Sequence, residues 1–199
     1  MSARRFLVLH GWENHRAIEH WQWWLVDRLR AEGEQVLYPQ LPSPDEPRLA
    51  DWLEVLAAEW TQMGDGERVV VTHSLSCLLW MHASLAGGPD PPADRVALVA
   101  PPSPQVIAGI PAVAEFHVAP DDRVREAVTA SSRDRVRLVA SDTDGYSPDG
   151  PASELYGRPL DLDADTVLGA GHVTIEDGYG PWPAVHAWCR DPRARFAVG

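Results

Sequence analysis

The sequence predicts an α/β protein, a compact three-layer sandwich in which a mainly parallel sheet of about six strands carries helices on both faces. Three observations support this class. Short apolar, often β-branched runs alternate with segments that have the three- and four-residue spacing of a helix face. Glycines and prolines separate these segments. The length of 199 residues suits one domain, which we expect to span 1–199.

The first half of the chain alternates regularly. Gly33 follows the first helical stripe, as a helix end prefers. Two prolines stop the second strand, and a Val-Val-Val run marks a buried third strand. The elements expected here are a strand at 6–9, a helix over 21–29, a strand at 35–38, a helix over 49–60, a strand at 68–72 and a helix over 75–85.

The second half is less regular. Five prolines fall between residues 101 and 120, and the helical and strand patterns weaken from 101 to 132. We expect an irregular excursion there, too short for a separate domain. The remaining elements expected are strands at 96–100, 136–140 and 166–168 and a final helix over 183–189.

Composition excludes several kinds of chemistry. The formal charge is −12, and all 17 basic residues are arginine. Without lysine the chain has no Schiff-base, P-loop or kinase lysine. The acidic balance argues against nucleic-acid binding. Two cysteines, Cys77 and Cys189, are too few for a disulfide framework, so we expect a reducing, cytoplasmic location. The apolar run at 6–9 is too short for a signal peptide, and no stretch is long enough to span a membrane.

Candidate catalytic residues follow the expected strands. In open α/β sheets the active site lies at the carboxyl ends of the strands. Ser74 follows the strand at 68–72, Asp142 and Asp144 follow the strand at 136–140, and His172 follows the last strand. Serine, aspartate and histidine in this chain order are typical of the triads of α/β hydrolases.

Each of these residues also has a simpler interpretation. A serine between a strand and a helix can be an N-cap, although a nucleophile elbow is itself such a turn. The two aspartates could be ordinary turn residues, and His172 could be a surface residue in a glycine-rich loop. The elbow normally has glycine two residues before and after the serine, whereas this chain has Thr72 and Ser76. The joint arrangement is much less expected by chance than any one member.

Three histidines, His10, His15 and His20, recur every five residues and could suggest a metal site. Five residues advance a helix by about 500°, so these side chains would not share a face. No carboxylate or cysteine cluster completes such a site. We therefore expect no metal, and we expect most of the nine tryptophans to pack in the core.

Motifs along nearly the whole chain carry a resemblance to one family. They are His10-Gly11-Trp12, Thr72-His73-Ser74-Leu75-Ser76-Cys77, Pro101-Pro102, Ser141-Asp142-Thr143-Asp144-Gly145-Tyr146 and Gly171-His172 with Gly178, Gly180, Trp182 and Pro183. Together they resemble the small serine hydrolases related to retinoblastoma-binding protein nine, a compact branch of the α/β hydrolases. That family typically has Gly-His-Ser-x-Gly at the elbow and Asp-Pro-Tyr in the acid loop. This chain departs from both.

The resemblance implies a serine hydrolase with Ser74 as nucleophile, His172 as base and Asp144 as the orienting acid, with Asp142 as the fallback. The backbone N–H groups of Trp12 and Leu75 would form the oxyanion hole. No cofactor is implied. Two alternatives stay open: a pseudoenzyme or protein-interaction module on the same fold, which Thr72 favours, and a thioesterase, acyltransferase or amidase using the same triad.

The sequence predicts only the size and charge of the substrate. A chain of this length has no residues to spare for a separate cap domain, so we expect a small acyl substrate in a shallow, open site. Esters of about two to four carbons should be preferred, without interfacial activation, because such a site offers a long chain little binding energy. Anionic substrates should be poor unless Arg16 or Arg123 lines the entrance.

Overall fold

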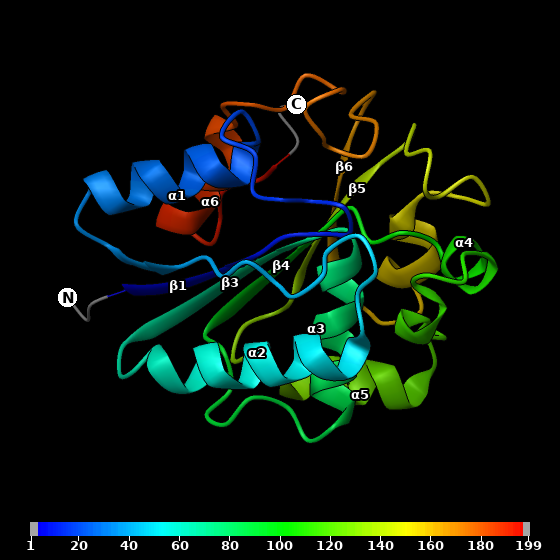
Figure 1. Ribbon diagram of the computed structural model, residues 1–199, viewed down its shortest axis with the longest axis horizontal. Helices are drawn as coiled ribbons and strands as arrows, with labels where there is room; N and C mark the ends of the chain where they lie inside the picture. The colour runs from blue at the N-terminus through cyan, green and yellow to red at the C-terminus, as the bar shows by residue number, and fades with distance from the viewer. Residues whose placement is uncertain (1–3, 197–199) are drawn as a thin grey trace.

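The computed structural model describes residues 4–196. Its strands are β1 (Arg4–Leu9), β2 (Gln35–Leu37), β3 (Glu67–His73), β4 (Arg95–Val99), β5 (Arg137–Ser141) and β6 (Asp163–Val167). They form a six-stranded sheet in the order β2-β1-β3-β4-β5-β6, and every neighbouring pair is parallel (Figure 1). The predicted α/β class with a mainly parallel sheet is therefore confirmed. Because all strands run the same way, their carboxyl ends meet at one edge.

Helices cover both faces of this sheet. Helices α1 (Trp21–Ala31) and α6 (Pro183–Arg190) lie on one face, and α2 (Leu49–Gln62), α3 (Leu75–Leu85) and α5 (Asp122–Ala130) on the other (Figure 1). Successive residues of β1 enter two different cores: Phe6 and Val8 pack with α1 and α6, whereas Leu7 and Leu9 pack with α2 and α3. This alternation of strand side chains builds two apolar layers and so accounts for the three-layer sandwich.

The segment after β4 contains more regular structure than expected. Helix α4 (Pro104–Gly109) begins after Ser103, whose side chain accepts a hydrogen bond from Val106 N, and a 3₁₀ turn follows at Ala114–Phe116. Helix α5 begins after Asp121, which caps Val124 N in the same way. The expectation of an irregular excursion over 101–132 is therefore wrong. Both N-caps are readable in the sequence, but the prolines and the charged outer face of α5 masked them.

The predicted position of the last strand is also wrong. β6 runs over Asp163–Val167 rather than 166–168, and a π-helical turn at Ser153–Gly157 precedes it. The buried Asp165 carboxylate pairs with Arg137 at 3.0 Å and with Arg195 at 2.7 Å. Two alternate residues of β6, Asp163 and Asp165, are acidic, and their carboxylates pair with arginines outside this strand. The composition of β6 is therefore that of a loop rather than of a strand.

None of the helices between residues 4 and 196 combines the length and apolar character that a bilayer crossing requires.

Candidate active site

Ser74 occupies a strained turn between β3 and α3. Its backbone has φ 54° and ψ −123°, in a region that residues other than glycine rarely adopt. The turn is held because Ser74 N donates a 2.9 Å hydrogen bond to the carbonyl of Val99 at the end of β4. Gly11 lies against it, and a Cβ at that position would come 2.8 Å from Ser74 Cβ. Only glycine therefore lets the loop after β1 approach the serine this closely.

The two departures from the usual elbow pattern each make hydrogen bonds. The buried Thr72 hydroxyl lies 3.2 Å from both the carbonyl oxygen of Ala97 and the Sγ of Cys77. The hydroxyl of Ser76 donates to the carbonyl of His10 at the end of β1. Both residues thus link the elbow to neighbouring strands. Burial raises the pKa of the nearby Cys77 thiol to about 12, so this side chain remains a neutral thiol near pH 7.

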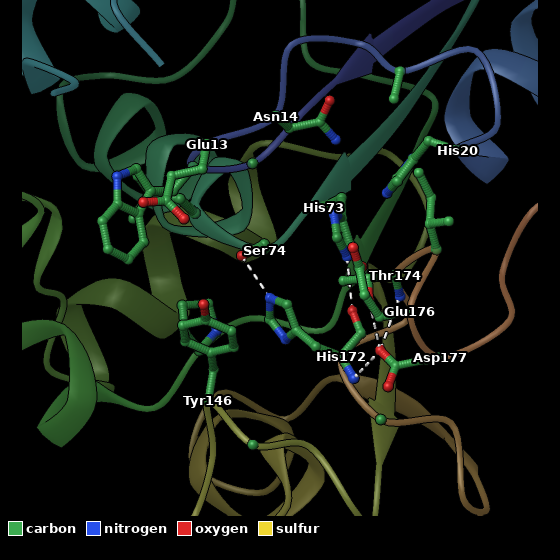
Figure 2. Close-up of a pocket in the computed structure, with 18 of the residues that line it drawn as sticks. Glu13, Asn14, His20, His73, Ser74, Tyr146, His172, Thr174, Glu176 and Asp177 are labelled. Atoms are coloured by element: carbon green, nitrogen blue, oxygen red, sulfur yellow. Dashed lines mark hydrogen bonds between the residues drawn. The ribbon is translucent and has the colours of Figure 1, made fainter. Parts of the chain in front are cut away.

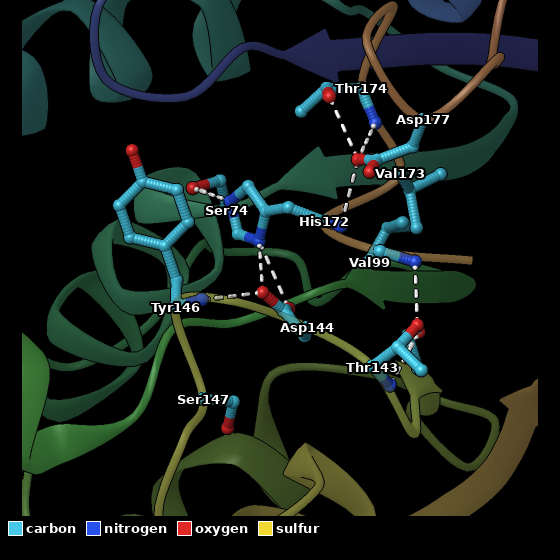
Figure 3. Close-up of polar contacts among 12 residues, drawn as sticks. Ser74, Val99, Thr143, Asp144, Tyr146, Ser147, His172, Val173, Thr174 and Asp177 are labelled. Atoms are coloured by element: carbon cyan, nitrogen blue, oxygen red, sulfur yellow. Dashed lines mark hydrogen bonds and ion pairs between the residues drawn. The ribbon is translucent and has the colours of Figure 1, made fainter. Parts of the chain in front are cut away.

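A chain of hydrogen bonds joins Ser74, His172 and Asp144 (Figure 3). His172 Nε2 lies 2.8 Å from Ser74 Oγ, and His172 Nδ1 lies 2.9 and 3.0 Å from the two carboxylate oxygens of Asp144. Tyr146 N also donates to Asp144 Oδ1, at 2.8 Å. All three members are more than nine-tenths buried. Since a carboxylate can only accept, Nδ1 carries the proton and Nε2 is free to accept from the serine hydroxyl.

The structure also separates the two candidate acids. Asp142 Oδ1 accepts a 2.7 Å hydrogen bond from Gly169 N, while Thr143 Oγ1 accepts one from Gly171 N at 3.1 Å. Both bonds tie the loop after β5 to the loop between β6 and α6. Asp144, and not Asp142, reaches the histidine. The fallback acid therefore holds the histidine loop in place instead of contacting the imidazole.

A residue that sequence reasoning missed shapes this histidine loop. Asp177 Oδ2 accepts hydrogen bonds from His172 N at 2.9 Å and from Thr174 N and Oγ1 at 3.1 and 2.8 Å. Gly171 has φ 55°, and a Cβ there would collide with the Asp177 carboxylate. The carboxylate thus closes a tight turn that fixes the backbone of the base. No signal in the sequence distinguishes Asp177 from an ordinary loop aspartate.

Other rings enclose the imidazole of His172. His73 Nε2 donates to the His172 carbonyl at 2.9 Å, and the two rings lie 5.3 Å apart. Tyr146 covers the imidazole from the open side, with ring centroids 4.5 Å apart (Figure 2). Burial holds the pKa of His73 well below its ordinary value and lowers that of His20 to about 4. Both side chains are therefore neutral near pH 7 and add no positive charge to the site.

A cavity of about 800 Å³ opens beside Ser74 and His172. Trp12 and Leu75, the two expected oxyanion donors, line it together with the serine. Leu75 is the first residue of α3, where backbone N–H groups have no partner within the helix and the helix dipole favours negative charge. One wall of the cavity is apolar and includes Pro102, Ile107 and Ile110.

The three histidines of the first loop have separate roles. His10 is buried and its pKa is lowered by burial to about 4, His15 is exposed and lies 2.9 Å from Asp45, and His20 accepts from Gln22 N as the N-cap of α1. Between residues 4 and 196 no three His, Cys, Asp or Glu side chains are grouped as a metal site would require.

Comparisons with known proteins agree with this fold. A segment of 75 residues is 34% identical to YdeN of Bacillus subtilis (strain 168); it covers 38% of this chain and 38% of that protein. The crystal structure of YdeN superposes with a TM-score of 0.78 at 22% identity, over 94% of this chain and 97% of the other. An esterase domain from Rhodothermus marinus superposes with a TM-score of 0.66 at 16% identity, over 94% and 86% of the two chains. Both structures show the α/β-hydrolase fold that the sequence predicts.

The family is shown by a match along most of the chain. The family model described as serine hydrolase matches residues 6–190, a range that includes all the motifs discussed above. This protein therefore belongs to the serine hydrolase family and is a hydrolase.

Proposed function

We propose that this protein hydrolyses small carboxylic esters through an acyl-enzyme intermediate on Ser74. The observation that carries the proposal is the continuous set of contacts from Ser74 Oγ to His172 Nε2, at 2.8 Å, and from His172 Nδ1 to Asp144, at 2.9 Å. A nucleophile, a base within hydrogen-bond reach and a third group that orients the base are the geometric signature of nucleophilic catalysis.

In the first half-reaction Ser74 Oγ attacks the carbonyl carbon of the ester while His172 Nε2 takes the hydroxyl proton. Asp144 keeps the imidazole in the required tautomer and stabilises the imidazolium that forms. The C–O bond to the alcohol then breaks, and the imidazolium returns its proton to the departing oxygen. In the second half-reaction water attacks the acyl carbon while the same imidazole takes its proton. The bond between the acyl carbon and Ser74 Oγ then breaks, the acid is released, and the imidazolium returns the proton to Ser74 Oγ.

The negative charge that develops on the substrate oxygen needs donors. We assign this role to the backbone N–H groups of Leu75 and Trp12, which line the cavity on the serine side. Losing one such donor typically costs about 3–4 kcal/mol of transition-state stabilisation. Because the proposed steps use only groups of the chain, the ester and water, the proposed reaction requires neither cofactor nor metal.

The structure around Thr72 bears on the alternative of a pseudoenzyme or interaction module. In the sequence this residue favours that alternative, but its hydroxyl is hydrogen-bonded and the elbow keeps its strained turn, so nothing at this position favours a decayed site. The resemblance to the branch of retinoblastoma-binding protein nine supports the residue roles. We also propose a cytoplasmic location, with which the two buried free cysteines agree.

A fluorophosphonate probe tests the proposal directly. The wild-type protein should be labelled on Ser74, as peptide mapping would show, and Ser74→Ala should be neither labelled nor active. A panel of an ester, a thioester and an aminoacyl amide with the same acyl group then identifies the bond that is cleaved. A label on Ser76, or a folded protein that is not labelled at all, would contradict the assignment.

A further inference from the structure

The charged groups that line the cavity are nearly all acidic. Glu13, Glu176 and Asp177 border it, and among residues 4–196 no arginine does. The chain has no lysine that could supply a positive charge instead. The cavity beside the nucleophile is therefore lined by carboxylates that come from the two loops after β1 and after β6.

Two of these carboxylates have no structural role that the described contacts reveal. Asp177 is used by the His172 turn, but within residues 4–196 the side chains of Glu13 and Glu176 make no hydrogen bond or ion pair with the protein. Figure 2 shows them on either side of the Ser74–His172 pair. Glu13 is held there by its backbone, which has φ 54° and donates a 2.9 Å hydrogen bond to the carbonyl of Pro44.

The nearby positive groups are already committed elsewhere. Arg16 donates to the carbonyl of Tyr38 at 2.7 Å and stacks over its ring, and it does not line the cavity. Arg123 lies on α5 and does not line it either. His15 does line the cavity, but its ring pairs with the Asp45 carboxylate at 2.9 Å. Within residues 4–196 none of these groups forms an ion pair with Glu13 or Glu176.

Aromatic surface lies beside Glu13. Trp12 and Tyr146 border the same cavity, and the Trp12 indole is fixed because its Nε1 donates to the carbonyl of Asp45 at 3.0 Å. Burial, and then the charge of Glu13, raise the pKa of Tyr146, which reflects how near this carboxylate lies to the phenol. A carboxylate next to aromatic rings is a favourable environment for an ammonium group, because the faces of such rings also attract cations.

We propose that the substrate of this site carries a positively charged ammonium group, which Glu13 holds against Trp12 and Tyr146. This inference rests on the proposed ester hydrolysis and names the substrate class for it. The cation can belong to the acyl group or to the alcohol, since the chemistry recognised is the same. Glu176 lies on the other side of the catalytic pair, close enough to His20 for its charge to act on the pKa of that histidine, and it contributes to the negative potential.

The experiment uses two matched pairs of esters. One pair has an acyl chain that ends in either a trimethylammonium or a neutral tert-butyl group, which have the same shape. The other has an acetate ester of choline and its tert-butyl isostere. For each pair we measure the ratio of kcat/KM, cationic over neutral, in the wild type and in Glu13→Gln, Glu176→Gln and Glu19→Gln. Glu19 is exposed, lies in the same loop as Glu13 and does not line the cavity, so it is the matched control.

In the wild type we expect the cationic ester to be favoured about tenfold in at least one pair, as one ion pair and one cation–π contact allow. Glu13→Gln should remove most of this preference, Glu176→Gln less of it, and Glu19→Gln should not change it. The preference should also shrink as ionic strength rises.

Contrary results separate the two proposals. Ratios at or below one, an equal loss in Glu13→Gln and Glu19→Gln, or a larger loss in Glu176→Gln would overturn recognition by Glu13, while labelling of Ser74 would leave ester hydrolysis standing. If none of the esters is hydrolysed and fluorophosphonate does not label Ser74, the proposed function fails, and this inference fails with it.

Discussion

Asp142 and Asp144 lie two residues apart in the same loop but contact different groups. Asp144 accepts from the imidazole of His172, whereas Asp142 accepts from the backbone N–H of Gly169. Residue order cannot predict this difference, because the path of an irregular loop decides which carboxylate faces the base. The motif resemblance ranked Asp144 first, and the geometry supports that choice as part of the proposed mechanism.

Substituting each acid by its amide should separate these roles. Asp144→Asn should lower kcat roughly 10⁴-fold, because the amide no longer requires the tautomer that leaves Nε2 free. Asp142→Asn keeps an oxygen that can accept from Gly169 N and should stay within a few-fold of the wild type. Steady-state kinetics on a nitrophenyl ester, with circular dichroism to verify folding, measures both. A reversed ranking would show that the acid of the reaction is Asp142.

The buried neutral histidines predict a loss of stability in acid. Burial lowers the pKa of His20 to about 4, so between about pH 4 and 6.5 the unfolded chain binds a proton there that the folded protein does not. The contribution of the neutral His20 to the free energy of unfolding is thus fully present above about pH 6.5 and is lost as the pH falls toward about 4. For His20 alone the loss at about pH 5 is on the order of 2 kcal/mol.

His20→Asn is the variant that tests this, because asparagine cannot titrate yet still offers an oxygen to cap Gln22 N. Urea unfolding at about pH 7.5 and pH 5 should show a smaller pH dependence in the variant than in the wild type, by roughly 2 kcal/mol. Equal pH dependence in the two proteins would mean that His20 is not kept neutral by folding.

The elbow shows how one element can accept unusual residues. A β-branched residue at position 72 is compatible with the turn because its hydroxyl faces Ala97 O and the Cys77 thiol rather than an empty space. Thr72 thus takes part in the packing between β3, β4 and α3. Its presence weakened the elbow signal in the sequence, although the local structure is intact.

Restoring the usual glycine should therefore be harmful. We expect Thr72→Gly to lower the free energy of unfolding by about 2–3 kcal/mol, since it removes a buried hydroxyl contact and side chain and adds chain entropy to the unfolded state. Thr72→Val, which keeps the shape without the hydroxyl, should cost less. Denaturant unfolding measures both, and an unchanged or more stable Thr72→Gly would mean that Thr72 strains the elbow.

Element prediction worked where hydrophobic patterning was strong and failed where charge replaced it. The buried strands β1, β3 and β4 were found within a few residues because each is a continuous apolar run with an abrupt end. β6 was displaced because Asp163 and Asp165 are neutralised by arginines far away in sequence. Long-range ion pairs leave no local pattern in the sequence.

At the scale of the whole molecule the candidate site depends on parallel strand order. Ser74 follows β3, Asp144 follows β5 and His172 follows β6, and all these strands end at the same edge of the sheet. Sequence order plus this single topological rule brings the three residues together. The cavity walls were not predictable in this way, because they come from α4 and from loops whose paths depend on tertiary packing.

The walls decide which acyl chains should fit. The cavity, at about 800 Å³, has room for more than a butyryl group, and one of its walls, with Pro102, Ile107 and Ile110, is apolar. Carboxylates of Glu13 and Glu176 also border it, and a long alkyl chain that reached them would displace their water without offering a hydrogen bond. Longer chains should therefore gain little binding energy that could raise kcat/KM.

We predict that kcat/KM for a series of neutral nitrophenyl esters peaks at acyl chains of about two to four carbons and declines beyond them, without interfacial activation. The series is measured at fixed ionic strength and below the solubility limit of each ester, with Ser74→Ala as the background. Acyl chains that end in a carboxylate should be hydrolysed more slowly than neutral chains of equal length, because the overall charge of −12 and the acidic rim repel them. A rate that climbs steadily toward long chains would mean that an apolar channel continues beyond Ile107 and Ile110, and that the carboxylate rim does not limit the substrate.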